Sequence, residues 1–358
     1  MNRHHYGLIL AGGRGTRFWP LSRKRSSKQV LRVVGERSLI QSTVDRLSPV
    51  IPPERLWILT NSDLRDEIVR QLPQVPKRQI LAEPAQRNTA PAIGLAAQLL
   101  HALDPESVMG VFPADHVVTK EAVYRAVVKA GLKSAAAGHL MVVGIQPRWP
   151  ETGYGYVEFP KDAQPGGWEP LTVRRFHEKP ELAKAKRYLK AGNFYWNSGM
   201  FFWRTEVLLN ELRKHLPKTA TILAGLPALK SSKFAAQLAE SFPLCDNISI
   251  DFAVLEKAAK VSGIAAPDFG WNDVGSWNAV YELMARDQCG NVVASSAICL
   301  DANDNFVDAR GKMVALLGVK DLVIVDTADA LLVTTRDHAQ RVGEIVKALE
   351  KAKRHDLL

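Results

Sequence analysis

The chain has 358 residues, 46% of them hydrophobic, and a formal net charge of +10. This length can bury a large core and favours two domains. The apolar runs are strand-sized, far short of the roughly 20 residues of a membrane helix, and the N-terminus lacks a signal-peptide pattern. Three cysteines without metal-ligand spacing indicate reduced thiols, so we expect a cytoplasmic protein.

The excess of positive charge predicts acidic partners, which include nucleic acid, anionic membranes and phosphorylated metabolites. Aromatic residues are not interleaved with the basic ones in a repeating way, which argues against nucleic acid. We therefore expect phosphorylated metabolites as partners, with no nucleic acid and no membrane.

Short apolar segments alternate with helical patterns through the first half of the chain. The expected strands are residues 6–11, 55–60, 78–83, 107–113 and 139–145, and helices are expected at 38–47, from 63, at 89–103 and at 120–136. This alternation predicts a Rossmann-like α/β fold, with a mixed, mainly parallel sheet and helices on both faces.

The pattern changes twice in the second half. After Tyr154 the strands become shorter and the helices scattered, and from about Asp287 the chain is almost entirely short β-type pieces separated by Asn, Asp and Gly. A last helical pattern follows near residues 337–354. We therefore expect a large α/β domain at 1–286 and a small β domain with a terminal helix at 287–358.

The first expected strand leads into a glycine-rich segment, residues 12–28, which we call the basic loop. It carries six Lys or Arg residues and no Asp or Glu. Glycines let backbone N–H groups approach an anion closely. Two familiar phosphate-binding patterns fail, because the dinucleotide pattern needs glycine at Phe18 and the P-loop pattern needs glycine at Arg17.

Two interpretations of the basic loop remain. A tight glycine turn with solvated Arg side chains is the simpler one. The cations repel one another without any acidic residue to neutralise them, which favours a bound polyanion. A triphosphate fits, with Gly12 and Gly13 against it and Arg17 and Lys28 within reach.

The segment LILAGGRGTRFWPLS, followed by KQ, resembles the signature of the sugar-1-phosphate nucleotidyltransferases, in particular the mannose-1-phosphate guanylyltransferases. Further motifs carry the resemblance over nearly the whole chain: EPAQRNTAPAIGLAA, FPADH, ETGYGYVE, FHEKP, WNSGMFFW, SIDFAVLEK and GWNDVGSW. Two positions depart from the family pattern, because Ser27 replaces a proline before Lys28 and Asn272 replaces a serine. The chain is shorter than the bifunctional relatives, so no isomerase domain is implied.

The resemblance implies transfer of GMP from GTP to mannose 1-phosphate with Mg²⁺ as cofactor, in a homodimer formed by a β-helix-like C-terminal domain. Two alternatives stay open: a related nucleotidyltransferase for another sugar 1-phosphate or nucleotide, and a non-catalytic paralogue that binds a nucleotide sugar. The resemblance makes Arg17 and Lys28 catalytic. It assigns nucleotide binding to Leu10, Ala11, Gly12, Gly13, Gly15, Thr16, Glu83, Arg87, Asn88, Thr89 and Ala90.

The motif EPAQRNTAPAIG has a structural and a functional interpretation. Asn88 or Thr89 can cap the helix expected at 89–103. Glu83 and Arg87 have no role in such a cap. A carboxylate can accept hydrogen bonds from both N1–H and the 2-amino group of guanine, so Glu83 is a candidate for recognising that base.

Asp115 and Asp273 are the candidate metal ligands. Each alone is explained by a helix cap or a turn, but two carboxylates and a triphosphate can form a Mg²⁺ site, and the resemblance implies that pairing. It also assigns the sugar-phosphate site to Asp115, Gly153, Glu178, Lys179 and Asn197. We expect His116, the aromatic residues and SIDFAVLEK to be structural.

Overall fold

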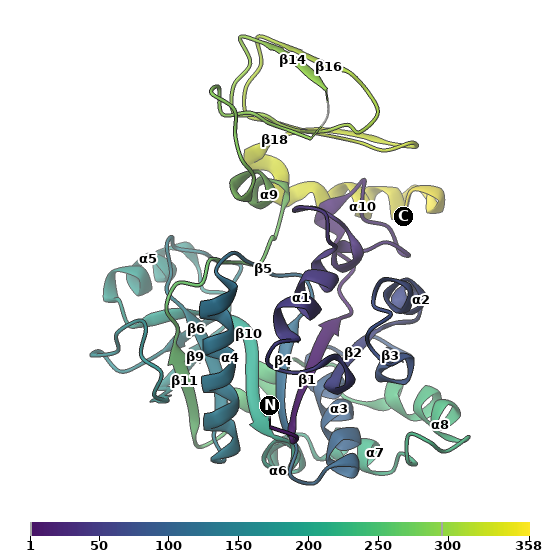
Figure 1. Cartoon of the computed structure of the whole chain (residues 1–358), viewed down its shortest axis with the longest axis vertical. Helices are drawn as coiled ribbons and strands as arrows, with labels where there is room; N and C mark the ends of the chain where they lie inside the picture. Colours follow the sequence, from purple (N-terminus) through teal and green to yellow (C-terminus); the bar gives the residue numbers. More distant parts are fainter. Residues whose placement is uncertain (1, 295) are drawn as a thin grey trace.

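The computed structural model describes residues 2–294 and 296–358. A large sheet with its helices forms the lower part of the molecule in Figure 1, and a small β region lies above it. Within the described residues, no helix combines the length and apolar character needed to cross a membrane.

The central sheet is mixed and mainly parallel. Its main path has the order β3-β2-β1-β4-β10-β6-β11-β8, and β7 and β9 extend it beside β10. The strands are β1 (His5–Ala11), β2 (Leu56–Asn61), β3 (Ile80–Glu83), β4 (Val108–Pro113), β6 (Leu140–Ile145), β7 (Tyr156–Glu158), β8 (Leu171–Thr172), β9 (Arg175–His177), β10 (Phe194–Arg204) and β11 (Val261–Ala265). β10 runs antiparallel between β4 and β6, so the parallel strands on either side of it share one direction.

Helices cover both faces of this sheet, because its strands are apolar on both sides. One face carries α1 (Leu39–Leu47), α2 (Ser62–Gln71) and α4 (Glu121–Ala136), and the other carries α3 (Thr89–Leu103), α6 (Thr205–His215), α7 (Pro217–Ala224) and α8 (Phe234–Ser241). Neighbouring residues of β1 alternate between the two cores: Leu8 packs with α3, whereas Ile9 packs with α1 and α4. The predicted fold class is confirmed.

Local capping explains where two helices begin. The Ser38 side chain accepts a hydrogen bond from the backbone N–H of Gln41, whose side chain in turn accepts from the N–H of Ser38, and α1 follows directly. Asn88 caps α3, which has the bounds expected from the sequence, and Pro91 sits in its first turn.

The C-terminal β region is a short coil of parallel strands. One sheet has the order β13 (Val292–Val293), β15 (Phe306–Asp308), β17 (Leu322–Asp326) and β18 (Leu331–Thr335); the other pairs β14 (Ala297–Leu300) with β16 (Val314–Leu317). All neighbouring strands are parallel except β17 and β18. Asn305 joins successive turns of the coil, donating to Asn291 Oδ1 at 2.9 Å and accepting from Leu322 N at 2.9 Å.

A third core joins the two parts of the molecule. Phe18 and Trp19 of the basic loop pack in one cluster with Trp277 of α9 (Trp277–Leu283) and with Phe306 and Val346 of the C-terminal region. Val346 belongs to α10 (Val342–Lys351), which lies between the small β region and the basic loop in Figure 1. The expected domain boundary near residue 287 stays a prediction.

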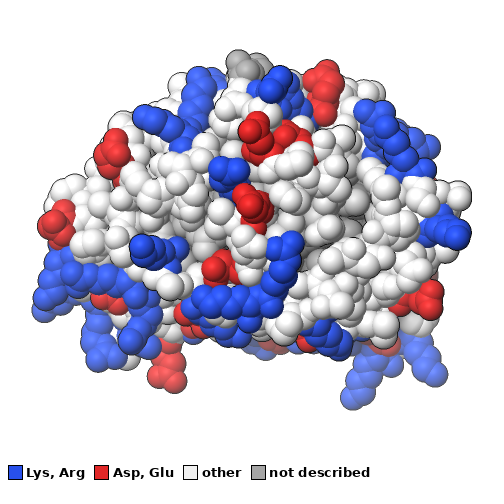
Figure 2. All heavy atoms as spheres, turned by 90° about the horizontal axis from the view of Figure 1, so that it is seen from below, with Lys and Arg blue, Asp and Glu red and all other residues white. Residues whose placement is uncertain are grey.

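The surface charge is not gathered on the face shown in Figure 2. There Lys and Arg side chains alternate with Asp and Glu around a broad area of uncharged residues. The basic loop has no acidic residue of its own, but in the fold Arg14, Arg23 and Lys28 pair with acidic residues of other segments, namely Glu350, Asp329 and Asp115.

Candidate active site

Lys28 is held at the centre of a buried charge cluster. Its side chain is 8% exposed, and its Nζ donates to Asp115 Oδ2 at 2.8 Å and to the carbonyl oxygen of Asp273 at 2.6 Å. Gly15 passes directly over it with a φ of +59°, where a Cβ would lie 2.5 Å from the Cβ of Lys28. Glycine is therefore required at this point of the basic loop by both conformation and space.

A small antiparallel ribbon brings the two candidate metal ligands together. β5 (Val117–Val118) follows Asp115, and β12 (Trp271–Asn272) precedes Asp273. The strands pair in antiparallel register, with Asn272 opposite Val117. This register places Asp273 opposite His116, one residue from Asp115, so both aspartates lie at the same end of the ribbon. Asp115 caps no helix, because α4 begins at Glu121.

Two further contacts fix Asp273. The side-chain oxygen of Asn272 accepts the N–H of Val274 at 2.7 Å, and Val274 has a φ of +48°. This Asx turn gives Asn272, the residue that departs from the family serine, a structural role. The hydroxyl of Tyr154 donates to Oδ1 of Asp273, and burial together with this carboxylate raises the pKa of Tyr154 above its ordinary value.

These residues line a cavity of about 340 Å³. Its walls are Gly15, Thr16, Arg17, Phe18, Lys28, Asp115, His116, Asp273 and Gly275. The guanidinium of Arg17 donates to the carbonyl oxygen of Gly275 at 3.4 Å. The structure thus brings both predicted catalytic residues and both predicted metal ligands into one cavity.

The protonation states in this cavity follow from its contacts. Burial would raise the pKa of Asp115, but the ammonium of Lys28 and its hydrogen bond hold that pKa below its ordinary value. Burial lowers the pKa of His116 to about 4. The indole N–H of Trp271 donates to Nδ1 of His116 at 3.1 Å, as a neutral imidazole requires, in agreement with a structural role.

The carboxylates of Asp115 and Asp273 fit a magnesium site that also uses ligand oxygens. Each has a side-chain hydrogen-bond partner at one oxygen, Lys28 or Tyr154, and both residues line the same cavity. Over residues 2–294 and 296–358, no group of three or more His, Cys, Asp or Glu side chains forms a site for a metal ion. Mg²⁺ held by a few carboxylates, phosphate oxygens and water matches this donor set.

A second cavity, of about 540 Å³, adjoins the carboxyl ends of β1, β2 and β3. It is lined by Leu10, Gly12, Gly13, Arg14, Gln29, Thr60, Asn61, Glu83, Gln86, Asn88, Thr89, Ala92, Asp115 and Asn247. Asp115 belongs to this cavity and to the one around Lys28, so the two adjoin. We call the larger one the nucleoside cavity.

Glu83 is a partly buried acid of the nucleoside cavity. Burial raises the pKa of its carboxyl group to about 7. Its Oε1 lies 3.9 Å from the position that a Cβ on Gly12 would take. A carboxylate in such a place is stabilised by a ligand that donates hydrogen bonds to it.

Three of the predicted nucleotide-binding residues do not line either cavity. Ala11 and Ala90 are fully buried in the cores. Arg87 lies where its charge acts on the Cys245 thiol, and its Nε is buried without a partner among the described residues. The neighbouring Gln86 lines the nucleoside cavity in its place.

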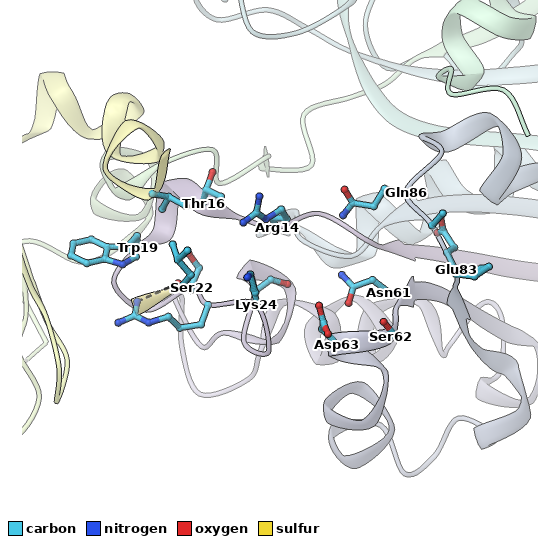
Figure 3. Close-up of a pocket in the computed structure, with 16 residues that line it drawn as sticks. Arg14, Thr16, Trp19, Ser22, Lys24, Asn61, Ser62, Asp63, Glu83 and Gln86 are labelled. Atoms are coloured by element: carbon cyan, nitrogen blue, oxygen red, sulfur yellow. Dashed lines mark hydrogen bonds between the residues drawn. The ribbon is translucent and has the colours of Figure 1, made fainter. Parts of the chain in front are cut away.

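A smaller cavity of about 290 Å³ lies on the other side of the basic loop (Figure 3). It shares Arg14, Asn61, Glu83 and Gln86 with the nucleoside cavity. Val346 of α10 completes its wall, so the C-terminal region reaches the nucleotide side of the molecule.

Two of the predicted sugar-phosphate residues, Glu178 and Lys179, lie near Asn197 of β10, which is a third. The Asn197 amide donates to Asp251 Oδ1 at 2.7 Å, and its backbone N–H donates to the carbonyl oxygen of Gly155. The Glu178 carboxylate lies against Gly155, because a Cβ on this glycine would be 2.7 Å from Glu178 Oε2. Lys179, with a φ of +39°, pairs with Glu178 at 2.8 Å.

Gly153 lies in the loop that leads to Gly155. Its N–H donates to Glu151 Oε1 at 2.8 Å. Tyr154, between the two glycines, contacts Asp273, so this loop connects the sugar residues to the cavity around Lys28.

Asp251 is a candidate that the sequence analysis did not select. It begins a π-helix (Asp251–Leu255), a conformation frequent at functional sites. Burial, followed by the charge of Glu178, raises its pKa to about 6. The available signal was an acid at the start of an otherwise apolar segment, which also fits an ordinary helix cap.

Comparisons with known proteins agree with this arrangement. Residues 6–289 match the nucleotidyl transferase family, and residues 295–349 match the MannoseP isomerase/GMP-like beta-helix domain. The chain is 38% identical over 353 residues to a mannose-1-phosphate guanylyltransferase of Klebsiella pneumoniae, covering 98% of this chain and 74% of that protein. It is 37% identical over 351 residues to the alginate biosynthesis protein AlgA of Pseudomonas aeruginosa, covering 96% and 72%.

A solved structure from Thermus thermophilus, described as a mannose-1-phosphate geranyltransferase, superposes with a TM-score of 0.85 at 33% identity. The match covers 97% of this chain and 99% of that one. The chain therefore belongs to the nucleotidyltransferase enzymes, in the mannose-1-phosphate guanylyltransferase family.

Proposed function

We propose that this enzyme transfers GMP from GTP to mannose 1-phosphate, giving GDP-mannose and pyrophosphate. The observation that carries the proposal is the position of Lys28 and the two aspartates. Their cavity shares Asp115 with the nucleoside cavity and is joined to the sugar residues through Tyr154. A reaction that connects a nucleotide to a sugar phosphate needs its charged groups at that junction.

The nucleophile is a phosphate oxygen of mannose 1-phosphate, which is ionised at neutral pH. It attacks the α-phosphorus of GTP, and the bond from that phosphorus to the bridging oxygen breaks as pyrophosphate leaves. No general base is needed, so positioning and charge stabilisation supply the catalysis. Lys28 and Arg17 lie where they can offset negative charge on the phosphates, and Lys179 aligns the sugar phosphate.

Asp115 and Asp273 would hold Mg²⁺ in this site. When bound, the ion offsets negative charge on the phosphates. Asp115, whose pKa is held below its ordinary value, binds as a carboxylate, and neither aspartate acts as a base.

Recognition of guanine would fall to Glu83. When ionised, its carboxylate can accept both N1–H and the 2-amino group, a donor pair that adenine and uracil lack. Burial raises the pKa of Glu83, and no cation is among the causes that set this pKa. A ligand that donates hydrogen bonds would stabilise the carboxylate, which supports the role. At the other end of the site, Glu178, Asn197 and Asp251 would bind hydroxyls of the hexose.

A substrate panel tests the proposal. Four nucleoside triphosphates are crossed with several sugar 1-phosphates, and pyrophosphate release is measured with Mg²⁺ and with a chelator. We expect the highest kcat/KM for GTP with mannose 1-phosphate, and loss of activity on chelation. A preference for another pair would identify a related transferase, and nucleotide-sugar binding without turnover would identify a non-catalytic paralogue.

We further propose that the enzyme is a cytoplasmic homodimer joined through its C-terminal β region. Ile298 and Leu300 of β14 and Leu317 of β16 are 52%, 57% and 71% exposed, an apolar cluster that a second copy would bury. Sedimentation of Leu317→Lys at micromolar concentration should show a shift toward monomer. A monomeric parent protein would contradict the proposal.

A further inference from the structure

The terminal helix α10 packs directly against the basic loop. Val342 and Val346 share a core with Phe18 and Trp19. The fit is close at Gly343, where an added Cβ would lie 3.2 Å from the hydroxyl of Thr16. Figure 3 shows the C-terminal helix, in yellow, beside Thr16 and Trp19.

Hydrogen bonds reinforce this packing at the end of the chain. The indole N–H of Trp19 donates to the carbonyl oxygen of Leu357 at 3.0 Å, and the carbonyl oxygen of Trp19 accepts from the indole N–H of Trp277 at 3.2 Å. The middle of the basic loop, from Thr16 to Trp19, is therefore fixed by elements far away in the sequence.

The first half of the loop has a different kind of contact. Arg14 stands between glycines, which leave its backbone little restricted. Its guanidinium donates to Glu350 Oε1 of α10 at 2.7 Å, across 336 sequence positions. The same arginine lines both the nucleoside cavity and the smaller cavity beside α10.

We propose that Glu350 is a positioning residue for nucleotide binding, because its ion pair with Arg14 holds that guanidinium at the nucleoside cavity. The proposal rests on GTP being the substrate. An unpaired arginine side chain samples many rotamers, and ordering it on binding costs conformational entropy. A guanidinium already ordered by Glu350 retains further N–H donors for phosphate oxygens.

The expected effect is modest, because the side chains of Arg14 and Glu350 are 45% and 40% exposed. Exposed ion pairs contribute little, so loss of this one should weaken GTP binding roughly two- to fivefold. Lys28 and the aspartates are untouched, so kcat should change by less than about twofold. A general loosening of the fold would instead lower kcat and the melting temperature together.

Glu350→Gln tests this inference, because it keeps the size of the side chain and removes its charge. The matched control is Glu344→Gln on the same helix, whose ion pair is with Arg341 and not with the basic loop. GTP affinity is measured by calorimetry, and KM and kcat are measured by pyrophosphate release. We expect weaker GTP binding and a higher KM only for Glu350→Gln, with equal melting temperatures.

A double-mutant cycle with Arg14→Gln sharpens the result. If Glu350 acts through Arg14, Glu350→Gln should have no further effect on GTP affinity in the Arg14→Gln background. Equal effects of Glu350→Gln in both backgrounds, unchanged affinity, or tighter GTP binding would each overturn the proposal. A parent protein that fails to bind GTP calorimetrically would instead contradict the proposed function.

Discussion

The cavity around Lys28 and the nucleoside cavity treat their charged groups in opposite ways. Around Lys28 the charges are already paired: its ammonium binds Asp115 at 2.8 Å, and the pKa of Asp115 is lowered. In the nucleoside cavity, Glu83 is partly buried, and desolvation raises its pKa to about 7 with no cation offsetting the effect. The charged groups of the first region are thus already paired, whereas the carboxyl group of Glu83 has no cationic partner among the causes of its raised pKa.

This difference predicts that disturbing the paired region removes turnover, while disturbing the nucleoside region changes selectivity and pH dependence. In the paired region, Lys28 lowers the pKa of Asp115 and hydrogen-bonds to the backbone of Asp273, so one substitution affects several groups. In the nucleoside cavity, a substitution at Glu83 should mainly change kcat/KM for substrates that carry guanine.

The largest effect should come from Lys28→Ala. Removing one preorganised charge-stabilising donor typically costs about 10²–10³-fold in kcat, and we expect a loss of that order. Because Asp115 would lose its partner, circular dichroism and thermal melting must show that the variant is folded. The matched control is Arg25→Ala, an exposed cation of the same loop. Unchanged kcat in a folded Lys28→Ala protein would rule out a catalytic role.

Asp115→Asn and Asp273→Asn should each lower turnover on the order of 10²-fold, since substitutions that only support a metal ligand already cost about 10–100-fold. Each should also require more Mg²⁺ for half-maximal activity. Their combined effect should be smaller than the product of the single effects, because residues that share one ligand are coupled. Fully multiplicative losses with unchanged Mg²⁺ dependence would exclude a shared ion.

Glu83→Gln should reduce kcat/KM for GTP about 10–100-fold, the equivalent of roughly 1.5–3 kcal/mol for charge-assisted hydrogen bonds. In the parent, kcat/KM should rise with pH through about 7 as Glu83 ionises, and the variant should lack this rise. Inosine triphosphate, which lacks the 2-amino group, provides the control. The parent should discriminate against it, and Glu83→Gln should discriminate much less.

The raised pKa of Glu83 also has a consequence for stability. Its ordinary value is 4.5 and its folded value about 7, so between these pH values the folded state binds the proton more tightly. The free energy of unfolding therefore falls as pH rises through this window. Chemical denaturation at pH 5 and pH 8 should show Glu83→Gln gaining stability relative to the parent at the higher pH.

Asp251→Asn tests the sugar end of the site. We expect KM for mannose 1-phosphate to rise on the order of tenfold, because a charged hydrogen-bond acceptor is replaced by a neutral one. KM for GTP should stay unchanged. Since burial raises the pKa of Asp251 to about 6, the variant should be no less stable than the parent at pH 8. An unchanged KM for mannose 1-phosphate would contradict a role of Asp251 in sugar binding and indicate a structural one.

The smallest effect should come from Ser27→Pro, which restores the family residue. Ser27 has a φ of −79°, which proline can adopt, so the unfolded chain would lose entropy. The substitution also removes the hydrogen bond from the Ser27 hydroxyl to Gln29, whose amide donates to the carbonyl oxygen of Gly13 at 3.0 Å. Each effect is on the order of 1 kcal/mol or less, so we expect activity within about threefold of the parent.

Much of the fold could be predicted because it depends on local patterns. The apolar segments and the Asn88 cap predicted α3 with its observed bounds. The insertion of β10 as an antiparallel strand between β4 and β6 could not be predicted, because no local sequence pattern indicates it. It depends on which strand edges are available once the rest of the sheet has formed.

The candidate site divides in the same way. The glycines and cations of the basic loop, and the aspartates at strand ends, could be found by residue type and position. The direction in which each side chain points could not be predicted from the sequence. Arg87 was expected at the nucleotide, but its neighbour Gln86 lines the nucleoside cavity instead. Asp251 was missed because its burial beside Asn197 and Glu178 depends on three distant segments.

The C-terminal region makes contacts that the sequence did not predict. From the resemblance we expected this region to form the homodimer, which stays a prediction. The structure places α10 against Thr16 and Trp19 and pairs Glu350 with Arg14. Deleting the region from about residue 287 would therefore expose a core shared with the basic loop, so a surface substitution such as Leu317→Lys is the cleaner test of assembly.

The sequence by itself determined the chemistry available to this enzyme: a glycine-rich loop with six cations and no acid of its own, an acid at the end of the third strand and two aspartates near the ends of strands. Only the tertiary structure decided which charges meet. The β5–β12 ribbon brings the segment of Asp115 beside that of Asp273, and Lys28 of the basic loop donates hydrogen bonds to both. Residue type fixes what a side chain can do, but its pKa and partners depend on burial and distance, which long-range packing sets.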